Sequence, residues 1–451
     1  MEFKNKKILV LGAAISGISV ARILAGHGAA VTLSDAKTAD QLKHDTSGLA
    51  AAGVTLALGR QDEALLDGVD ILVLSPGISI YIPLVEAAEK RGIAVMSEIE
   101  IAYRLTKAPI VAITGTNGKT TTTTLTGEIL IAAGREVVVG GNIGQALSAE
   151  VQGVSPDGVV VAEISSFQLE GVSAFKPHIA AILNLTPDHI DRHRDLATYQ
   201  AMKERVFANQ TADDYLILNY DDPAVRAMAQ RAPSQVVYFS RTGKLPVGFY
   251  VEDNIIKLTW LDETLDICPL AALKIPGAHN VENALAACAA AYFAGARPRD
   301  MAAVLGTFTG VEHRIEPVAT INGVTWYNDS KATNPESSIK ALEAFPAHII
   351  LIAGGRDKNT DLGEFMSLAR EKVDHLILIG EAAERFAAAA GRHGVKDIRR
   401  PADLPAAVAL AHSLARPPQL VLLSPACASY DMFNNYEERG KIFKDLVRRL
   451  R

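Results

Sequence analysis

Residues 110–124, with the sequence IVAITGTNGKTTTTT, join an apolar run to a threonine-rich run through a short loop with two glycines and a lysine. This order is typical of a buried strand that turns sharply into a helix, because glycine allows a tight turn and the first helical N–H groups are free. Such a loop can surround phosphate oxygens, while the lysine reaches the β- and γ-phosphates and a hydroxyl helps to hold Mg²⁺. The segment therefore predicts an α/β fold that binds ATP.

The predicted loop is shorter than the general G-x-x-x-x-G-K-[ST] pattern, because Ile113 stands where the first glycine of that pattern would be. A glycine-rich turn with a solvated lysine is the alternative. The apolar strand before the loop and the threonines after it favour nucleotide binding. The loop residues predicted to contact ATP are Gly115, Thr116, Asn117, Gly118, Lys119, Thr120 and Thr121.

The chain has 451 residues, and at ~150 residues per domain this length predicts about three domains. Short runs rich in Val, Ile and Leu alternate with alanine-rich helical stretches, which indicates parallel sheets covered by helices. We expect an α/β protein with a Rossmann-like N-terminal domain over residues 1–97, a central P-loop domain with an ATP-binding parallel sheet over 98–310, and a C-terminal Rossmann-like domain over 311–451.

Individual strands are predicted where β-branched residues and leucines cluster. In the first domain they cover residues 7–11, 31–34 and 71–74, with a helix over 16–27. In the central domain they cover 109–114, 158–163, 179–184 and 215–219, and an alanine-rich helix covers 283–294. In the third domain they cover 325–327, 348–353, 375–379 and 420–423, each but the last followed by a helical stretch.

Charge and cysteine content narrow the classes of partner. The net charge is −6, so there is no chain-wide basic field to attract nucleic acid or an anionic membrane. The three cysteines are far apart and lack C-x-x-C spacing, which argues against a disulfide framework or a zinc site. No apolar stretch reaches the ~18 residues of a membrane span. We therefore expect a soluble cytoplasmic protein that binds no nucleic acid and does not insert into membranes.

The N-terminal domain carries Gly12 and Gly17 after its first strand, and Asp35 ends its second strand. This resembles a dinucleotide fingerprint in which Ala14 replaces the middle glycine, and the alanine Cβ hinders the close approach of a pyrophosphate. Two interpretations are equally compatible with the pattern: glycines that only permit tight strand–helix packing, or a crevice for a nucleotide-diphosphate conjugate. The crevice residues would be Ile15, Ser16, Asp35, Lys37, Ser75 and Gly77.

The central domain offers candidates for metal binding at its strand ends. Glu163 ends an apolar strand, where doubly wound sheets place their ligands, and is a candidate Mg²⁺ carboxylate. The segment 186–193, TPDHIDRH, follows another apolar strand and could form a second metal or phosphate site. For Asp188, Asp191 and His193, taken singly, helix capping or solvation is the favoured interpretation.

Lys203 lies four residues after Tyr199 and four before Phe207. This helical spacing predicts an amphipathic helix, and by default a surface lysine on it. The pattern by itself gives no reason to assign Lys203 a further role.

Several long motifs occur in order along the whole chain, and together they resemble the Mur ligases. They are ITGTNGKTTT at 113–122, EISSFQLE at 163–170, LNLTPDHIDRH at 183–193, PGAHNVENALAA at 276–287, HRIEPV at 313–318, NDSKATNPES at 328–337 and LLSPACASYDMFNNYEERG at 422–440. The resemblance implies three α/β domains: an N-terminal one that holds the UDP end of the substrate, a central ATP domain, and a C-terminal domain that closes over both.

The resemblance also implies an ATP-dependent amide ligation. The carboxylate of UDP-N-acetylmuramoyl-L-alanine attacks the γ-phosphate to give an acyl phosphate and ADP, and the amine of D-glutamate then expels phosphate. Such a transfer depends on positioning and on charge stabilisation, here by Mg²⁺, Lys119 and Arg314. By motif position, Thr120 and Glu163 would bind one Mg²⁺. A second would be bound by His189, which also faces the substrate, and by Lys203, which the resemblance implies is carbamylated and so an anionic oxygen ligand.

The remaining site residues are likewise implied by motif position. ATP would contact Asn283, Arg314 at its phosphates and Asp329 at its ribose. Asn142 is matched to a phosphate or muramoyl contact of the substrate, and Lys331 to the reacting groups. The positions matched to D-glutamate are Thr333, Lys358, Ser429 and Tyr436, the last of which is commonly phenylalanine in the family.

Two other classes of function share parts of this pattern. Another Mur ligase or a folylpolyglutamate synthase would share the ATP core, but folate-type relatives begin with the ATP domain, whereas this chain places a Rossmann-like domain before it. A nicotinamide-dependent oxidoreductase or a P-loop switch protein is disfavoured by Ala14 and by the two C-terminal motifs, which have no use in a switch. We expect a ligase that acts as a monomer.

Overall fold

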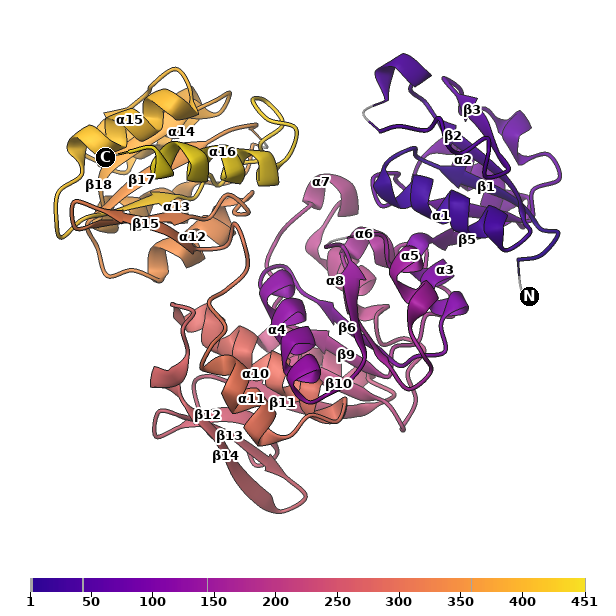
Figure 1. The fold of residues 1–451 in the computed structure, drawn as a ribbon, viewed down its shortest axis with the longest axis horizontal. Helices are drawn as coiled ribbons and strands as arrows, with labels where there is room; N and C mark the ends of the chain where they lie inside the picture. Colours follow the sequence, from indigo (N-terminus) through magenta and orange to yellow (C-terminus); the bar gives the residue numbers. More distant parts are fainter. Residues whose placement is uncertain (1–2, 43, 144, 358, 451) are drawn as a thin grey trace. The chain divides into compact units, whose positions relative to one another are not determined.

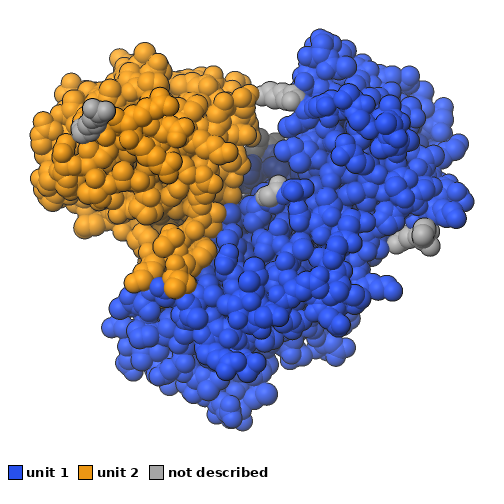
Figure 2. Space-filling model, viewed as in Figure 1, with its two compact units in different colours: residues 1–272, 282–306 blue, residues 273–281, 307–451 orange. Residues whose placement is uncertain are grey.

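The computed structural model describes residues 3–42, 44–143, 145–357 and 359–450. The chain divides into two compact units, one made of Met1–Ala272 and Glu282–Gly306, the other of Leu273–Val281 and Thr307–Arg451 (Figure 2). The described strands form three sheets, two in the first unit and one in the second (Figure 1). The predicted α/β class is confirmed, while the domain boundaries at 97 and 310 stay predictions because compactness separates only two units.

Five of the described strands form the first sheet, all parallel, in the order β3-β2-β1-β4-β5. The strands are short and apolar because helices cover both faces of a parallel sheet. The strand order reverses between β1 and β4, so the loops after these two strands border a crevice at the carboxyl edge of the sheet. The elements are β1 (Lys7–Leu11), α1 (Ile15–Gly26), β2 (Ala30–Asp35), β3 (Val54–Leu58), β4 (Ile71–Leu74), α2 (Pro83–Lys90) and β5 (Ala94–Ser97).

Nine of the described strands form the second sheet, in the order β14-β13-β12-β11-β10-β9-β6-β8-β7. The pairings from β7 across to β12 are parallel, and those of β13 with its two neighbours are antiparallel. The strand order reverses at β6, so the loop after β6 opens at the switch point where such sheets bind ligands.

The strands of the second sheet are β6 (Ile110–Thr114), β7 (Val137–Gly141), β8 (Val159–Glu163), β9 (Ile179–Ile182), β10 (Tyr215–Asn219), β11 (Gln235–Ser240), β12 (Gly248–Glu252), β13 (Ile255–Trp260) and β14 (Glu263–Pro269). The helices of this part of the chain are α3 (Glu98–Leu105), α4 (Lys119–Ala132), α5 (Leu147–Glu150), α6 (Ser166–Leu169), α7 (Ile190–His193), α8 (Leu196–Glu204), α9 (Pro223–Ala227), α10 (Ala278–Phe293) and α11 (Pro298–Leu305).

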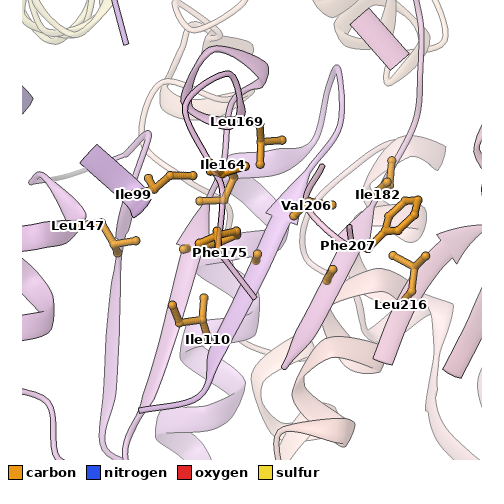
Figure 3. Packing of buried hydrophobic residues seen from close by; sticks show 14 of the residues in the cluster. Ile99, Ile110, Leu147, Ile164, Leu169, Phe175, Ile182, Val206, Phe207 and Leu216 are labelled. Carbon is orange, nitrogen blue, oxygen red and sulfur yellow. The ribbon is translucent and has the colours of Figure 1, made fainter. Parts of the chain in front are cut away.

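Apolar side chains from strands and covering helices form the core beside the second sheet (Figure 3). Ile110 of β6 and Ile182 of β9 are buried in one cluster with Leu147 of α5 and Ile99 of α3. Ile101, two residues further along α3, is buried in the core of the first sheet instead. Helix α3 therefore packs on both sheets of the first unit.

The third sheet has the order β15-β16-β20-β17-β18-β19, and only the β15–β16 pair is antiparallel. Its strands are β15 (Glu316–Ile321), β16 (Val324–Asn328), β17 (Ile349–Gly354), β18 (Val373–Ile379), β19 (Ile398–Arg399) and β20 (Leu420–Leu423). The helices are α12 (Pro335–Glu343), α13 (Gly363–Lys372), α14 (Ala383–Arg392), α15 (Leu404–Leu414) and α16 (Tyr436–Arg448).

The predicted strands at 7–11, 71–74, 215–219 and 420–423 coincide with β1, β4, β10 and β20. One prediction for the third domain is wrong, because the last strand, β20, is also followed by a helix, α16. Asn435 caps α16 by accepting a hydrogen bond from the backbone N–H of Glu438. Polar residues dominate the first turns of α16, and its apolar anchors Phe443 and Val447 come late, so the helical period is weak at its start.

The strands β12, β13 and β14 were not predicted. Two-residue turns join them, and all four turn residues have positive φ: Asp253 at 53°, Asn254 at 58°, Leu261 at 49° and Asp262 at 65°. Such turns match the twist of a hairpin but usually contain glycine, which is absent here. The usual sequence signal for a hairpin is therefore missing.

Two general properties concern the helices and the cysteines. Within the described ranges, every helix is too short or too polar to cross a membrane.

Cys268, Cys288 and Cys427 are buried, free thiols. Burial raises the pKa of the Cys268 thiol to about 11, which keeps this thiol protonated and unreactive.

The close approach of α1 to β1 provides a test of the packing role of Gly17. A Cβ on Gly17 would lie 1.9 Å from the Gly12 carbonyl oxygen and 2.5 Å from the Ser75 hydroxyl. Because the carbonyl is backbone and cannot move cheaply, Gly17→Ala should destabilise the chain by about 1–3 kcal/mol and lower its urea midpoint.

Gly26, in the same helix, is the matched control, because a Cβ there would meet no atom within 4 Å. Gly26→Ala should be neutral or stabilising by up to ~1 kcal/mol. Equal urea midpoints for the two variants would contradict the packing role of Gly17.

Candidate active site

The predicted phosphate loop joins β6 to α4 with a backbone that its glycines allow. Gly115 has φ +152° and Gly118 has φ +83°, both in the region that L side chains rarely adopt. Gly118 is the N-cap of α4, so the free N–H groups and the positive end of the helix dipole lie at the loop. A Cβ on Gly118 would lie 2.2 Å from Oδ1 of Asn283, so Asn283, predicted to contact ATP, packs directly on the loop.

The segment that follows β9 holds the loop in shape, a role that no sequence pattern indicated. Asn184 accepts a hydrogen bond from the Asn117 N–H at 2.8 Å and donates to the Asn117 carbonyl at 3.1 Å. The Thr116 hydroxyl donates to the Thr186 carbonyl at 3.1 Å and lies 3.2 Å from the Tyr199 hydroxyl. Thr116 and Asn117 are thus bound to the segment after β9, so their backbone positions are defined before any ligand is considered.

Two lysines contact the same carbonyl oxygen of this loop. Nζ of Lys119 lies 2.9 Å from the Gly115 carbonyl and 2.7 Å from the Thr116 carbonyl, and Nζ of Lys203 lies 2.9 Å from the Gly115 carbonyl. Lys203 is only 1% exposed, so its prediction as a surface lysine is wrong. Burial and the charge of Lys119 hold the pKa of Lys203 well below its usual value, against the opposing charge of Asp188. This environment favours the neutral amine.

Glu163 ends β8 beside the strand of the phosphate loop, in register with Ile113 of β6. The residue is 1% exposed, and its Oε1 accepts a hydrogen bond from Nδ2 of Asn142 at 2.8 Å. Its Oε2 is buried and has no hydrogen-bond partner among the residues that the structure describes. A buried carboxylate oxygen without a partner is costly, and a hard cation such as Mg²⁺ would satisfy it. Glu163 therefore fits the metal role predicted for it, with Asn142 in contact.

The other predicted metal ligands are of mixed type. Thr120, the predicted hydroxyl ligand, is buried in the first turn of α4, as is Thr121, which is predicted only to contact ATP. Over the described ranges, no group of three or more His, Cys, Asp and Glu side chains could hold a metal. The predicted set would not form such a group, because it combines a hydroxyl, a carboxylate, an imidazole and a modified lysine.

His189 begins the short helix α7 in a left-handed conformation, with φ +53°. Its ring packs against the ring of Phe167, with centroids 4.7 Å apart, and its Nε2 lies 3.6 Å from Oδ2 of Asp188. His193, at the other end of α7, is fully buried with Nε2 2.9 Å from the Ser166 hydroxyl, so its interpretation as a solvated residue is wrong. A metal shared by His189 and Lys203 stays a prediction.

The residues predicted to bind substrate in the first domain lie where β1, β2 and β4 end. Asp35 accepts hydrogen bonds from the N–H groups of Ala13 at 2.8 Å and Lys37 at 2.9 Å. Ser75 is buried and donates to the Gly12 carbonyl at 2.9 Å. These bonds brace the loop after β1. Of the predicted set, Ile15, Lys37 and Gly77 are exposed, and Ser16 and Asp35 are partly exposed. The two interpretations of the glycine pattern are therefore compatible: Gly17 packs tightly against the loop after β1, and the edge of the crevice is still accessible.

Arg314 and Asp329, both predicted to face ATP, lie together in the second unit. Nη1 of Arg314 is 3.7 Å from Oδ1 of Asp329. Asp329 is fully buried and accepts hydrogen bonds from the Ser424 hydroxyl at 2.8 Å and the Ile315 N–H at 3.3 Å. Burial raises the pKa of Asp329 to about 6, although Arg314 and these bonds lower it. Asp329 thus orients Arg314, and its contact with a ribose stays a prediction.

Lys331, matched to the reacting groups, contacts Tyr436, which is matched to D-glutamate. Nζ of Lys331 donates to the Tyr436 hydroxyl at 3.2 Å and lies 5.1 Å from the centre of the tyrosine ring. Ser429 is buried and Thr333 is half-buried. Lys358, predicted with them, lies outside the described residues.

Arg439 was not predicted, yet it joins two of the C-terminal motifs. It is fully buried, and its guanidinium donates to the Ser330 carbonyl at 2.8 Å, the Ser330 hydroxyl at 3.0 Å and the Cys427 carbonyl at 3.2 Å. Burial lowers the pKa of Arg439 to about 10, so it stays charged at neutral pH. An arginine in a charged helical turn is usually exposed, which is why the pattern gave no signal.

The loop, the two lysines and the Glu163 carboxylate, whose Oε2 has no hydrogen-bond partner in the described part of the chain, are the features of one class of protein, the P-loop nucleotide-binding α/β proteins. Comparison with protein families refines this class. Residues 6–97 match the Mur ligase MurD-like N-terminal domain, residues 113–291 the Mur ligase middle domain, and residues 313–427 the Mur ligase glutamate ligase domain.

Curated relatives match over the full length of the chain. It is 47% identical over 446 residues to the UDP-N-acetylmuramoylalanine--D-glutamate ligase of Pelotomaculum thermopropionicum, which covers 99% of this chain and 98% of that protein. It is 46% identical over 453 residues to the protein of that name from Thermoanaerobacter sp. (strain X514), with 100% of both covered. Among solved structures, a pseudomurein peptide ligase type C from Methanothermus fervidus has the same fold, with a TM-score of 0.62 and 21% identity over 99% of this chain and 100% of that chain. The chain belongs to the Mur ligase family.

Membership of this family rules out the oxidoreductase and switch-protein alternatives. The N-terminal match at 6–97 agrees with a chain in which a complete domain precedes the ATP domain. The first sheet therefore belongs to a Mur ligase N-terminal domain, and its crevice is not a nicotinamide site.

The contact of Gly118 with Asn283 leads to a prediction about ATP binding. Gly118→Ala would place a Cβ 2.2 Å from Oδ1 of Asn283 on a backbone with φ +83°. The loop or Asn283 must then move, so ATP affinity measured by calorimetry should fall at least about tenfold, equivalent to ~1.4 kcal/mol.

The matched control is Gly134→Ala, because Gly134 also has a positive φ, +77°, but a Cβ there would meet no atom within 4 Å. This variant bears similar backbone strain of about 1–2 kcal/mol without touching the loop, so its ATP affinity should be unchanged. Equal losses of ATP affinity in both variants would refute the steric explanation.

Proposed function

We propose that this chain is an ATP-dependent ligase that joins D-glutamate to the L-alanine carboxylate of UDP-N-acetylmuramoyl-L-alanine in peptidoglycan precursor synthesis. The observation that carries the proposal is the full-length similarity, at 47% identity, to a protein named for that ligation. The geometry of the phosphate loop supports the ATP half of the reaction.

In the first half-reaction, a carboxylate oxygen of the substrate attacks the γ-phosphorus of ATP. The bond from that phosphorus to the β,γ-bridging oxygen breaks, and ADP leaves with the electron pair. The loop N–H groups would hold the phosphates, and Lys119, already bound to two loop carbonyls, would stabilise the transferred phosphoryl group together with Arg314.

In the second half-reaction, the amine nitrogen of D-glutamate attacks the acyl carbon. The carbon–oxygen bond to phosphate breaks, phosphate leaves with the electron pair, and the new amide nitrogen loses a proton. We assign the side-chain carboxylate of D-glutamate to cationic and hydroxyl groups, because charged hydrogen bonds give both affinity and orientation. The assigned residues are Thr333, Lys358, Ser429 and Tyr436, with Lys331 beside Tyr436.

One Mg²⁺ is assigned to Thr120 and Glu163. The fit rests on Oε2 of Glu163, which is buried with no hydrogen-bond partner in the described part of the chain. When bound, such an ion neutralises phosphate charge. Asn142 holds the other carboxylate oxygen, which leaves Oε2 as the ligand.

A second Mg²⁺ is assigned to His189 and a carbamylated Lys203. Carbamylation requires a neutral amine that attacks CO₂, forms a nitrogen–carbon bond and releases a proton, leaving an anionic carbamate. The lowered pKa of the buried Lys203, caused by burial and by Lys119, supports this chemistry. An unmodified ammonium would instead repel a cation.

The three domains predicted over residues 1–97, 98–310 and 311–451 would bind the UDP end of the substrate, ATP and D-glutamate respectively. Ile15, Ser16, Lys37 and Gly77 retain exposed surface at the edge of the first sheet where the UDP end would bind. Asn142 and His189 would face the muramoyl end, and we propose that the enzyme acts as a monomer.

The substrate assignment predicts phosphate release that depends on D-glutamate. With ATP, Mg²⁺ and UDP-N-acetylmuramoyl-L-alanine, release should be at least about 100-fold slower when L-glutamate, L-alanine or a diamino acid replaces D-glutamate. L-Alanine and diamino acids lack the side-chain carboxylate at that position, and L-glutamate cannot place its carboxylates and its amine in the same positions at once, so each leaves polar groups of the site unpaired. Absence of stimulation by D-glutamate would overturn the proposal. Equal stimulation by another amino acid would overturn the choice of D-glutamate and indicate another ligation of the same family.

The carbamate assignment predicts that activity depends on bicarbonate and on Lys203. Lys203→Arg keeps a cation but cannot be carbamylated, so kcat should fall at least about 100-fold. Protein prepared with ¹³C-bicarbonate should show a carbamate carbon signal that Lys203→Arg lacks.

Lys444→Arg is the control, because Lys444 is also largely buried but is paired with Glu312 and Glu316. This variant should retain both the signal and the bicarbonate dependence. Full wild-type activity in bicarbonate-free buffer, without a carbamate signal, would contradict the assignment.

A further inference from the structure

Arg192, in α7, connects two segments of the first unit that lie far apart in sequence. Its Nη1 donates to the Pro76 carbonyl at 3.1 Å and its Nη2 to the Ile78 carbonyl at 2.6 Å. The same guanidinium pairs with Glu170, with Nε 3.0 Å from Oε1 and Nη2 2.5 Å from Oε2. The side chains of Arg192 and Glu170 are 13% and 2% exposed, so this network is largely shielded from water.

The network uses the fork geometry of arginine. A guanidinium carries five N–H donors in one plane, so it can bind a carboxylate at two points and still reach two carbonyl oxygens. The carboxylate of Glu170 therefore fixes the plane in which Arg192 meets the carbonyls of Pro76 and Ile78. A lysine has a single nitrogen and cannot make these four contacts together.

On one side, this network ends at the turn after β4. That turn contains Ser75 and Gly77, which are assigned to the UDP end of the substrate. A second cation from the same segment supports it, since the guanidinium of Arg194 lies 4.3 Å from the centre of the Tyr81 ring. Two arginines separated by one residue thus contact the turn after β4 and the residues that follow it.

On the other side, the network ends at His189. The Arg192 guanidinium carbon lies 4.2 Å from the centre of the Phe167 ring, and that ring packs on His189 with centroids 4.7 Å apart. His189 is assigned to the muramoyl end of the substrate and to a metal. One side chain therefore contacts both the turn that binds the nucleotide end and the aromatic ring that supports the reacting end.

We propose that Arg192 is a positioning residue for the ligation, which sets the separation between the turn of residues 75–78 and His189. The inference rests on the proposed function, because it needs a substrate long enough to occupy both places. A substrate held at both ends presents its carboxylate at one defined position, and a shift of ~1 Å at the reacting end is enough to cost a large factor in rate. The partners of Arg192 within the described residues are Pro76, Ile78, Glu170 and Phe167, and none of them belongs to the phosphate loop, so ATP binding should not depend on Arg192.

The test compares Arg192→Ala and Arg192→Lys with a matched arginine. Arg205 also donates to backbone carbonyls of the same region, those of Glu170 at 2.7 Å and Val172 at 2.5 Å, but within the described residues it makes no hydrogen bond to the turn after β4. Arg205→Lys thus removes an arginine fork near Glu170 while leaving every hydrogen bond of Arg192 in place. Steady-state phosphate release gives KM for each substrate and kcat, and calorimetry gives the affinity for UDP-N-acetylmuramoyl-L-alanine.

Both Arg192 variants should raise KM for UDP-N-acetylmuramoyl-L-alanine at least about tenfold and lower kcat at least about tenfold, while KM for ATP stays within about twofold. Arg192→Lys should be the milder variant, since one ammonium can keep one of the contacts. Arg205→Lys should leave the KM for UDP-N-acetylmuramoyl-L-alanine unchanged. If Arg192→Ala does not fold, as judged by circular dichroism, Arg192→Lys decides the outcome.

An unchanged KM for UDP-N-acetylmuramoyl-L-alanine in a folded Arg192 variant would overturn the inference. So would an equal rise in Arg205→Lys, which would indicate general loosening of the unit. Failure of the proposed function is a separate result, because it would be seen in the wild-type protein as phosphate release that does not respond to D-glutamate.

Discussion

The carbonyl oxygen of Gly115 accepts hydrogen bonds from Lys119 and Lys203, and the chemistry of the first unit depends on this shared contact. Lys119 belongs to α4 and Lys203 to α8, so one oxygen at the end of β6 is bonded to two helices. Two ammonium groups at one acceptor repel each other. The repulsion affects the protonation of Lys203, because burial and the charge of Lys119 both disfavour its charged form and hold its pKa well below the usual value. Burial at the contact that closes the loop therefore shifts Lys203 toward its uncharged form.

Buried polar groups that lack full compensation lie near the carboxyl ends of the central strands. Oε2 of Glu163, at the end of β8, is buried with no hydrogen-bond partner within the described ranges, and Lys203 is a buried lysine whose charged form is disfavoured. Neither arrangement helps an isolated domain to fold, since each leaves a polar group poorly compensated. The packed core beside the second sheet, which includes Ile110, Ile182 and Leu147, supplies the stability that lets such groups persist.

The sequence predicted the parts of the fold that rest on local periodicity, such as β1, β4, β10 and β20, and the parts of the site that follow strand ends, such as Gly118 and Glu163. It did not predict the burial of Lys203, although Lys203 lies one helical turn after the buried Tyr199 on α8. Burying a lysine is unfavourable by itself, and the carbonyl that receives it lies 88 residues earlier in the chain. Contacts across such separations, like that of Asn184 with Asn117, leave no periodic pattern to detect.

Both units use a largely buried arginine to organise loops that follow strands. Arg192 binds the carbonyls of Pro76 and Ile78, and Arg439 binds those of Ser330 and Cys427. Loops at strand ends leave sheet pairing, so their carbonyls need partners elsewhere. A guanidinium satisfies several at once from one plane, and it keeps its charge even where burial lowers the pKa of Arg439 to about 10. Irregular loops can therefore be held in defined positions without regular secondary structure, which a site assembled from several strand ends requires.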